Sequence, residues 1–159
     1  MTARQLAQAV TAARTFLSEA QPLYVSRPKP ISDRLRCAHD VYQFVLDHRP
    51  TFPTEEAEVF LAVVLNGKHC CKAVVEVAKG TLASVDVHPR ELFRELIVRA
   101  AAAAFVIHNH PSGDFEPSPD DLALTARLRD VGRLVGIPIL DHLIVGAEGY
   151  VSLAERGLL

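Results

Sequence analysis

The sequence predicts an α/β fold with three layers, in which helices cover both faces of a mixed β-sheet. Two observations support this class. Short apolar runs of strand length alternate with longer segments whose apolar residues recur at helical spacing. An Asn-Gly turn between two such runs indicates an antiparallel hairpin, while helices between other runs indicate parallel crossovers. Hairpins beside crossovers give mixed strand directions in a sheet with both faces covered.

The first fifty residues are predicted to form a helical segment in front of the sheet. Residues 2–20 carry apolar side chains at helical spacing, so we expect an amphipathic helix that packs on the domain or on a second copy of the chain. Prolines favour an extended connector over residues 21–31. Ser32 is expected to cap a second helix that runs to about His48.

Residues 51–159 are predicted to form the domain that contains the sheet. Asn66-Gly67 is a strong hairpin signal between two apolar runs. Pro89 and Pro119 each suit the first turn of a helix. The expected strands are 59–65, 72–78, 82–85, 105–107, 137–145 and 150–151, and the expected helices are 89–102 and 119–135.

Composition favours a globular chain of the cytoplasm, with no membrane partner. Hydrophobic residues make up 49% of the chain, yet no apolar run approaches the ~20 residues that span a bilayer, and the N-terminus lacks an apolar signal segment. Three cysteines, two of them adjacent, indicate reduced thiols. Residues 1–50 hold seven Lys or Arg against four Asp or Glu, whereas residues 51–159 hold ten against fifteen. That acidic balance is unlike the basic face of a duplex-binding domain.

The most informative motif is His108-Asn109-His110, at the end of an apolar run. Alternate residues of a strand point to the same side, so both imidazoles can face one ion. Asp121, at the start of the next helix, can supply a carboxylate. Two nitrogens and one oxygen leave a fourth position for water, as in catalytic zinc sites. The same donors also suit a non-haem iron centre, and a pair of hydrogen-bonded histidines is the alternative without metal.

The acidic helix start has two interpretations. With Ser118 as N-cap and Pro119 at the first helical position, Asp121 falls where a carboxylate closes a capping box. We expect Asp121 to be a metal ligand and Asp120 to keep the capping role. The Ser118 hydroxyl can cap the helix, donate to a developing oxyanion, or do both in different states.

The spacing H-x-H-x7-S-x2-D over His108, His110, Ser118 and Asp121 resembles the metal-binding motif of the JAMM (MPN-type) metalloprotease superfamily. The wider string from His108 to Asp114 is similar to its bacterial RadC branch, and the resemblance covers roughly residues 54–159. It implies a deaminase-like three-layer fold and Zn²⁺ held by both histidines and Asp121. It also implies that Ser118 stabilises the transition state.

The resemblance further implies a glutamate that precedes a buried strand and takes a proton from the metal-bound water. Glu58 stands directly before the strand expected at 59–65 and resembles that position. A glutamate at the edge of a buried strand is costly unless it is paired or functional. Glu55 and Glu56 are close enough to be confused with it, but we expect both in a solvated turn.

These residues predict a zinc-dependent metallopeptidase-type hydrolase that cleaves an amide or isopeptide bond in a protein or peptide substrate. The rival is a DNA-repair-associated nucleic-acid-binding module, which the family name suggests. The acidic charge and the lack of a clear helix-hairpin-helix element argue against that rival. His142, beside Asp141 on an apolar strand, is either a core histidine with its hydrogen bonds satisfied or a partner of a metal ligand.

Overall fold

A computed structural model describes residues 34–80 and 87–159 of the chain. It contains a five-stranded sheet in the order β2-β1-β3-β4-β5. Only the central pair β3–β4 is parallel; the other three pairs are antiparallel, so the predicted mixed sheet is confirmed. The strands are β1 (Val59–Leu65), β2 (Cys71–Lys79), β3 (Ala103–Asn109), β4 (Ile139–Val145) and β5 (Tyr150–Ser152).

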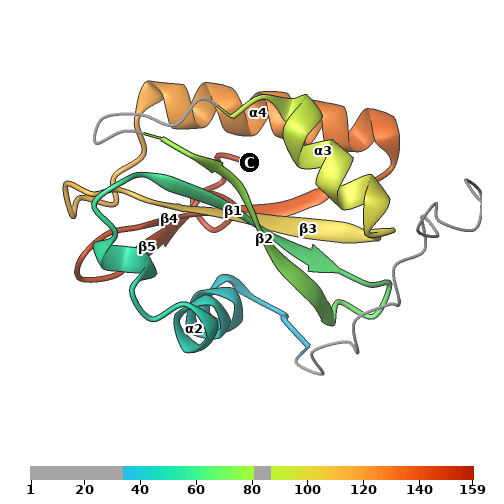
Figure 1. Cartoon of the computed structure of the whole chain (residues 1–159). Helices are drawn as coiled ribbons and strands as arrows, with labels where there is room; N and C mark the ends of the chain where they lie inside the picture. Colours follow the sequence, from blue (N-terminus) through green and yellow to red (C-terminus); the bar gives the residue numbers. More distant parts are fainter. Residues whose placement is uncertain (1–33, 81–86) are drawn as a thin grey trace, which may run out of the picture.

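Helices lie on both faces of this sheet (Figure 1). Helices α3 (Pro89–Val98) and α4 (Pro119–Val135) cover one face, and α2 (Ala38–His48) covers the other. A short 3₁₀ turn, η1 (Phe52–Thr54), connects α2 to β1. None of the helices in residues 34–80 and 87–159 is long and apolar enough to cross a membrane.

The alternation of side chains along the strands explains the two covered faces. In β1 every residue is buried, because odd positions pack in the core under α2 and even positions pack in the core under α3 and α4. β3 divides in the same way and is also buried throughout. Apolar runs without alternation are typical of strands covered on both faces. This parity decides which side chains of β1 and β3 can face α4.

The second predicted helix begins later than expected. α2 starts at Ala38 with Cys37 as its N-cap, and residues 34–37 are not helical, so the expected helix does not extend back to residue 34. The backbone before it joins the β1–β2 hairpin instead, since Leu35 N–H donates to the carbonyl of His69 at 3.0 Å. His69 is distant in sequence, so the residues around Leu35 give no local sign that this contact replaces a helix.

The remaining boundaries agree with the predictions to within a few residues. α3 stops at Val98 rather than near residue 102, because Ala102 N–H already donates to the Leu65 carbonyl of the sheet. The expected helix at 2–20, connector at 21–31, cap at Ser32 and strand at 82–85 lie outside the described residues. The proposed division of the chain at residue 50 stays a prediction; α2 itself packs in one core with β1, β3 and β4.

Candidate metal centre

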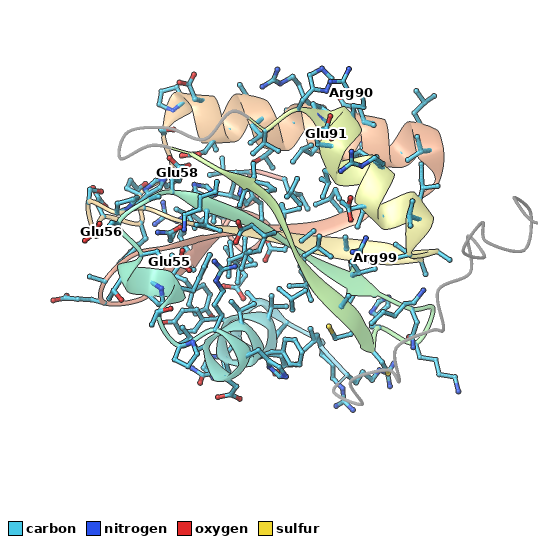
Figure 2. All side chains as sticks on the ribbon, viewed as in Figure 1. Glu55, Glu56, Glu58, Arg90, Glu91 and Arg99 are labelled. Carbon is cyan, nitrogen blue, oxygen red and sulfur yellow. The ribbon has the colours of Figure 1, made fainter. Side chains whose placement is uncertain are left out.

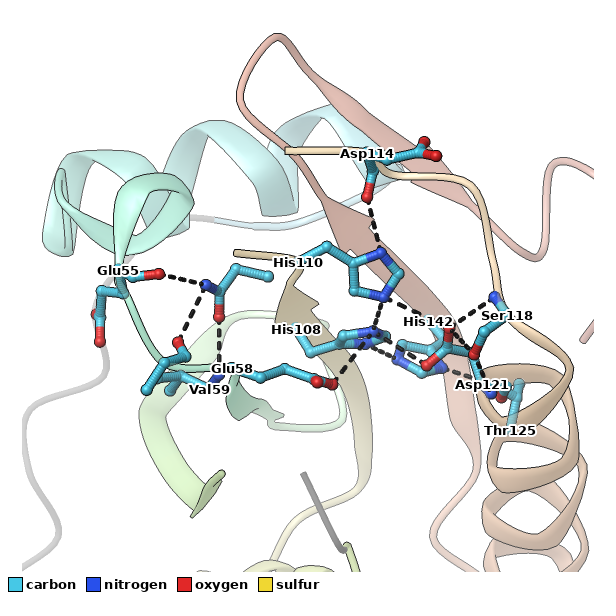
Figure 3. A network of polar contacts seen from close by, with 12 residues as sticks. Glu55, Glu58, Val59, His108, His110, Asp114, Ser118, Asp121, Thr125 and His142 are labelled. Carbon is cyan, nitrogen blue, oxygen red and sulfur yellow. Dashed lines mark hydrogen bonds and ion pairs between the residues drawn. The ribbon is translucent and has the colours of Figure 1, made fainter. Parts of the chain in front are cut away.

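Four of the predicted site residues meet at one end of the sheet (Figure 3). Glu58, His108, His110 and Asp121 each offer one potential ligand atom, and these atoms all lie within 4.8 Å of one another. They come from three separate places: the residue before β1, the end of β3 and the first turn of α4. The structure therefore brings together side chains that are up to 63 positions apart in sequence.

Strand register explains why Glu58 joins the histidines. Phe60 of β1 pairs with His108 of β3 in the antiparallel ladder. Glu58 is two residues before Phe60 and His110 two residues after His108, so all of them share the face that α4 covers. Asp121 is on α4 and closes the site from above that face.

Both histidines turn the same ring nitrogen toward the site. Their Nε2 atoms lie 3.0 Å apart. The Nδ1 of His110 lies 2.7 Å from the Asp114 carbonyl, which can only accept, so this Nδ1 carries a hydrogen. The Nδ1 of His108 lies 2.8 Å from Nε2 of His142. Occupied Nδ1 atoms beside converging Nε2 atoms are typical of metal-binding histidines.

The Asp121 carboxylate serves the helix and the site at the same time. Its Oδ2 accepts hydrogen bonds from the Ser118 backbone N–H at 2.8 Å and from the Ser118 hydroxyl at 2.6 Å. Its Oδ1 lies 3.1 Å from the His108 Nε2. Ser118 in turn accepts from the Asp121 N–H, which completes a capping box. Asp121 thus makes the cap that was assigned to the exposed Asp120, so that assignment is wrong.

Contacts within the site determine which groups are charged. Burial opposes ionisation of Asp121, but hydrogen bonds from His108 and His110 outweigh it and hold the pKa of this carboxyl well below its usual range. The hydrogen bond with Asp121 raises the pKa of His110. The site therefore contains an ionised carboxylate, which is the form that binds a cation.

The three neighbouring glutamates differ in their surroundings (Figure 2). Glu58 has a side chain 12% exposed, with Oε1 3.8 Å from His108 Nε2. Glu56 is exposed, as predicted. Glu55 is not solvated, contrary to the prediction: its side chain is 13% exposed and forms ion pairs with Arg49 at 2.8 Å and Lys79 at 3.4 Å. Arg49 is the C-cap residue of α2, and Lys79 is the last residue of β2.

Asn109, which stands between the two histidines in sequence and is fully buried, was not among the predicted site residues. Its Oδ1 accepts from the Val59 N–H at 2.7 Å, and its Nδ2 donates to the carbonyls of Glu55 and Ala57 at 3.3 and 3.2 Å. The alternation that turns His108 and His110 to one face turns Asn109 to the other, where the segment carrying Glu58 begins. A polar residue at a position expected to be buried was the available signal.

His142 satisfies both interpretations of the sequence. It is fully buried, and it contacts the ring of a candidate ligand, His108. Burial lowers the pKa of His142 well below its ordinary value, so the neutral ring is the form in the folded chain.

The fold and site define an α/β domain with a candidate metal centre of two histidines and two carboxylates. Residues 35–158 match the RadC-like JAB domain family, and the chain belongs to this family. It is similar to UPF0758 proteins of Desulforudis audaxviator (45% identical over 132 residues, 83% of this chain and 56% of the relative) and Syntrophotalea carbinolica (49% over 102 residues, 64% and 45%). A UPF0758 protein of Geobacter sulfurreducens is 36% identical over 149 residues, 94% of this chain and 64% of the relative. The chain spans about half the length of the curated relatives it matches.

Proposed function

We propose that this chain is a zinc-dependent hydrolase that cleaves an amide or isopeptide bond in a protein or peptide substrate. One observation carries the proposal: two imidazole nitrogens and two carboxylates, from three separate places in the chain, converge within 4.8 Å. Family membership supports it, because the JAMM superfamily that the motif resembles includes metal-dependent hydrolases.

The donor set fits a zinc ion. His108 and His110 would supply Nε2, and Asp121 would supply Oδ1, the oxygen that is not used by the helix cap. Three protein ligands of these types are the usual number in catalytic zinc sites, which keep one position open. Iron accepts the same donors, so metal analysis of anaerobically purified protein distinguishes the two ions.

The chain's own residues then have separate tasks. A zinc ion held by His108, His110 and Asp121 would lower the pKa of a water to about 7 and would polarise the substrate carbonyl. The Glu58 carboxylate would accept a proton from the attacking water and return it to the leaving amine. Ser118 is the proposed hydroxyl donor to the oxyanion that develops on the substrate.

The test is a cleavage screen of peptide and isopeptide substrates with the zinc-loaded chain and its Glu58→Gln variant. The amide keeps the shape of the side chain but takes no proton, so turnover should fall ~10²–10⁴-fold while zinc stays bound. This loss corresponds to roughly 3–5 kcal/mol in the activation barrier. Glu56→Gln, at an exposed position two residues earlier, is the matched control and should keep full turnover. Equal turnover of Glu58→Gln and the unchanged chain would exclude Glu58 as the base.

A further inference from the structure

A line of buried side chains runs behind the candidate metal centre (Figure 3). His108 Nδ1 lies 2.8 Å from His142 Nε2, and His142 Nδ1 lies 2.6 Å from the Thr125 hydroxyl. Thr125 donates in turn to the backbone carbonyl of Asp121 at 2.6 Å. The line therefore begins at one candidate ligand on β3, passes through β4, and ends at the backbone of another candidate ligand on α4.

The side chains of this line are buried, so water cannot replace a hydrogen-bond partner that one of them loses. His142 is 0% exposed, and His108 and Thr125 are each 1% exposed. A buried polar group that loses its partner keeps the full cost of its desolvation, so each member depends on the next one. The Phe60 ring also restrains both imidazoles: it stacks on His108 with centroids 5.9 Å apart and meets the edge of His142 at 5.4 Å.

The hydrogens along this line have one consistent direction. The Asp121 carbonyl can only accept, so the Thr125 hydroxyl hydrogen points to it. Thr125 has no further hydrogen to donate, so it accepts from Nδ1–H of His142. For His108 to bind a metal through Nε2, its hydrogen lies on Nδ1, and Nε2 of His142 accepts from it. With a metal ion bound, His108 would present the lone pair of Nε2, the atom that lies 3.1 Å from Asp121 Oδ1.

We propose that His142 and Thr125 are positioning residues for the metal centre, which hold His108 in the tautomer that presents Nε2 and join β4 to the ligand-bearing turn of α4. This inference rests on the proposed function, because it concerns the same site. Hydrogen bonds to the outer nitrogen of a ligand histidine fix its ring and raise its basicity, and their loss typically weakens metal binding 10–100-fold.

The experiment compares Thr125→Val, Thr125→Ser and His142→Leu with the unchanged chain. Zinc affinity is measured by competition with a chromophoric chelator, and ligand geometry by the absorption spectrum of the Co²⁺-substituted protein. Thr125→Val keeps the shape of the side chain but removes the hydroxyl; it and His142→Leu should bind zinc roughly 10–100-fold more weakly and change the cobalt spectrum. Thr125→Ser restores the hydroxyl and should restore both properties.

A control separates positioning from general loss of stability. Leu128, one turn further along α4, is fully buried but makes none of these hydrogen bonds. Leu128→Ala should lower the resistance of the metal-free chain to urea and leave zinc affinity and the cobalt spectrum unchanged. If His142→Leu fails to fold, the comparison of Thr125→Val with Thr125→Ser still tests the positioning role.

Failure of this inference differs from failure of the proposed function. Zinc held equally tightly by Thr125→Val and by the unchanged chain, with the same cobalt spectrum, would overturn the positioning role alone. Zinc held equally by the chain with and without His108 and His110 would overturn the metal centre itself, and the positioning role with it.

Discussion

The Asn109 side chain accepts a hydrogen bond from the Val59 backbone N–H at 2.7 Å. The residue between the two candidate ligand histidines thus holds the first residue of β1, next to Glu58. A change of the Asn109 side chain therefore acts on the segment that carries the proposed base.

We therefore expect Asn109→Ala to disturb the proposed base, Glu58, while the metal ligands keep their function. Removing this buried acceptor should cost about 1–3 kcal/mol of stability, because the Val59 N–H loses its partner. Turnover should fall while zinc is retained, since both histidines remain. Asn66 is the control: its Oδ1 also accepts backbone N–H groups, but in the β1–β2 loop. Asn66→Ala should lower the denaturation midpoint without slowing turnover, and an equal fall in both variants would count against the link to Glu58.

Zinc content should depend on the two histidines together. We expect one zinc per chain, and its loss in the His108→Ala/His110→Ala variant, measured by elemental analysis after gel filtration. Replacing the exposed His39 by alanine should leave the content unchanged. Full zinc occupancy in the double variant would place the ion elsewhere.

Adjacent aspartates at the start of α4 should behave differently. Asp121→Asn should lose the metal, because its ionised Oδ1 faces the histidines, and should also weaken the capping box. Asp120→Asn should keep the metal and lose only ~0.3–1 kcal/mol, since exposed Asp120 interacts with the helix dipole alone. Metal titration and urea unfolding of both variants measure the difference. Metal loss in Asp120→Asn would place the ligand one residue earlier.

Glu55 should matter for stability and not for chemistry. Its ion pairs with Arg49 and Lys79 join α2's end to β2, so Glu55→Gln should lower the free energy of unfolding by up to ~1 kcal/mol. Zinc content and turnover should not change, because its carboxylate is engaged by these two cations. High salt should reduce the difference from the unchanged chain. A large loss of turnover would show that Glu55 takes part in proton transfer.

The loop after His110 lies so close to Gly146 in another loop that only glycine fits at that position. A Cβ on Gly146 would lie 2.2 Å from the carbonyl oxygen of Gly113, far inside van der Waals contact. Gly146→Ala must therefore displace the loop whose Asp114 carbonyl accepts from His110. We expect weaker zinc binding in a chelator competition assay. Gly67→Ala, where a Cβ meets nothing within 4 Å, should bind zinc like the unchanged chain, and an equal effect of both changes would exclude this explanation.

The elements that sequence predicted best carry their signals locally. Ser118, Pro119 and Asp121 marked the start of α4 correctly, because capping depends on residues within one turn. The His108 and His110 pair could be placed on one face because strand periodicity needs no partner. The family resemblance pointed to Glu58, which the β1–β3 register then brought beside the histidines.

The features that were missed depend on distant partners. The late start of α2 follows from the bond between Leu35 and His69, 34 positions away. One of the ion pairs of Glu55 is with Lys79 on β2, 24 positions away. The hydrogen bond between Thr125 and His142 forms only when α4 lies against β4, because the two residues are 17 positions apart. None of these pairings is encoded in a short window of sequence.

The shared carboxylate of Asp121 has a consequence for how an ion would enter the site. Folding of α4 already immobilises this side chain, so the conformational entropy of ordering it is lost when the helix forms and not when metal binds. A site ordered in advance binds more tightly than one that must be assembled around its ligand. Removal of the ion should therefore leave a folded protein that can bind metal again. Its near-UV circular dichroism spectrum should be the same before chelation and after reloading.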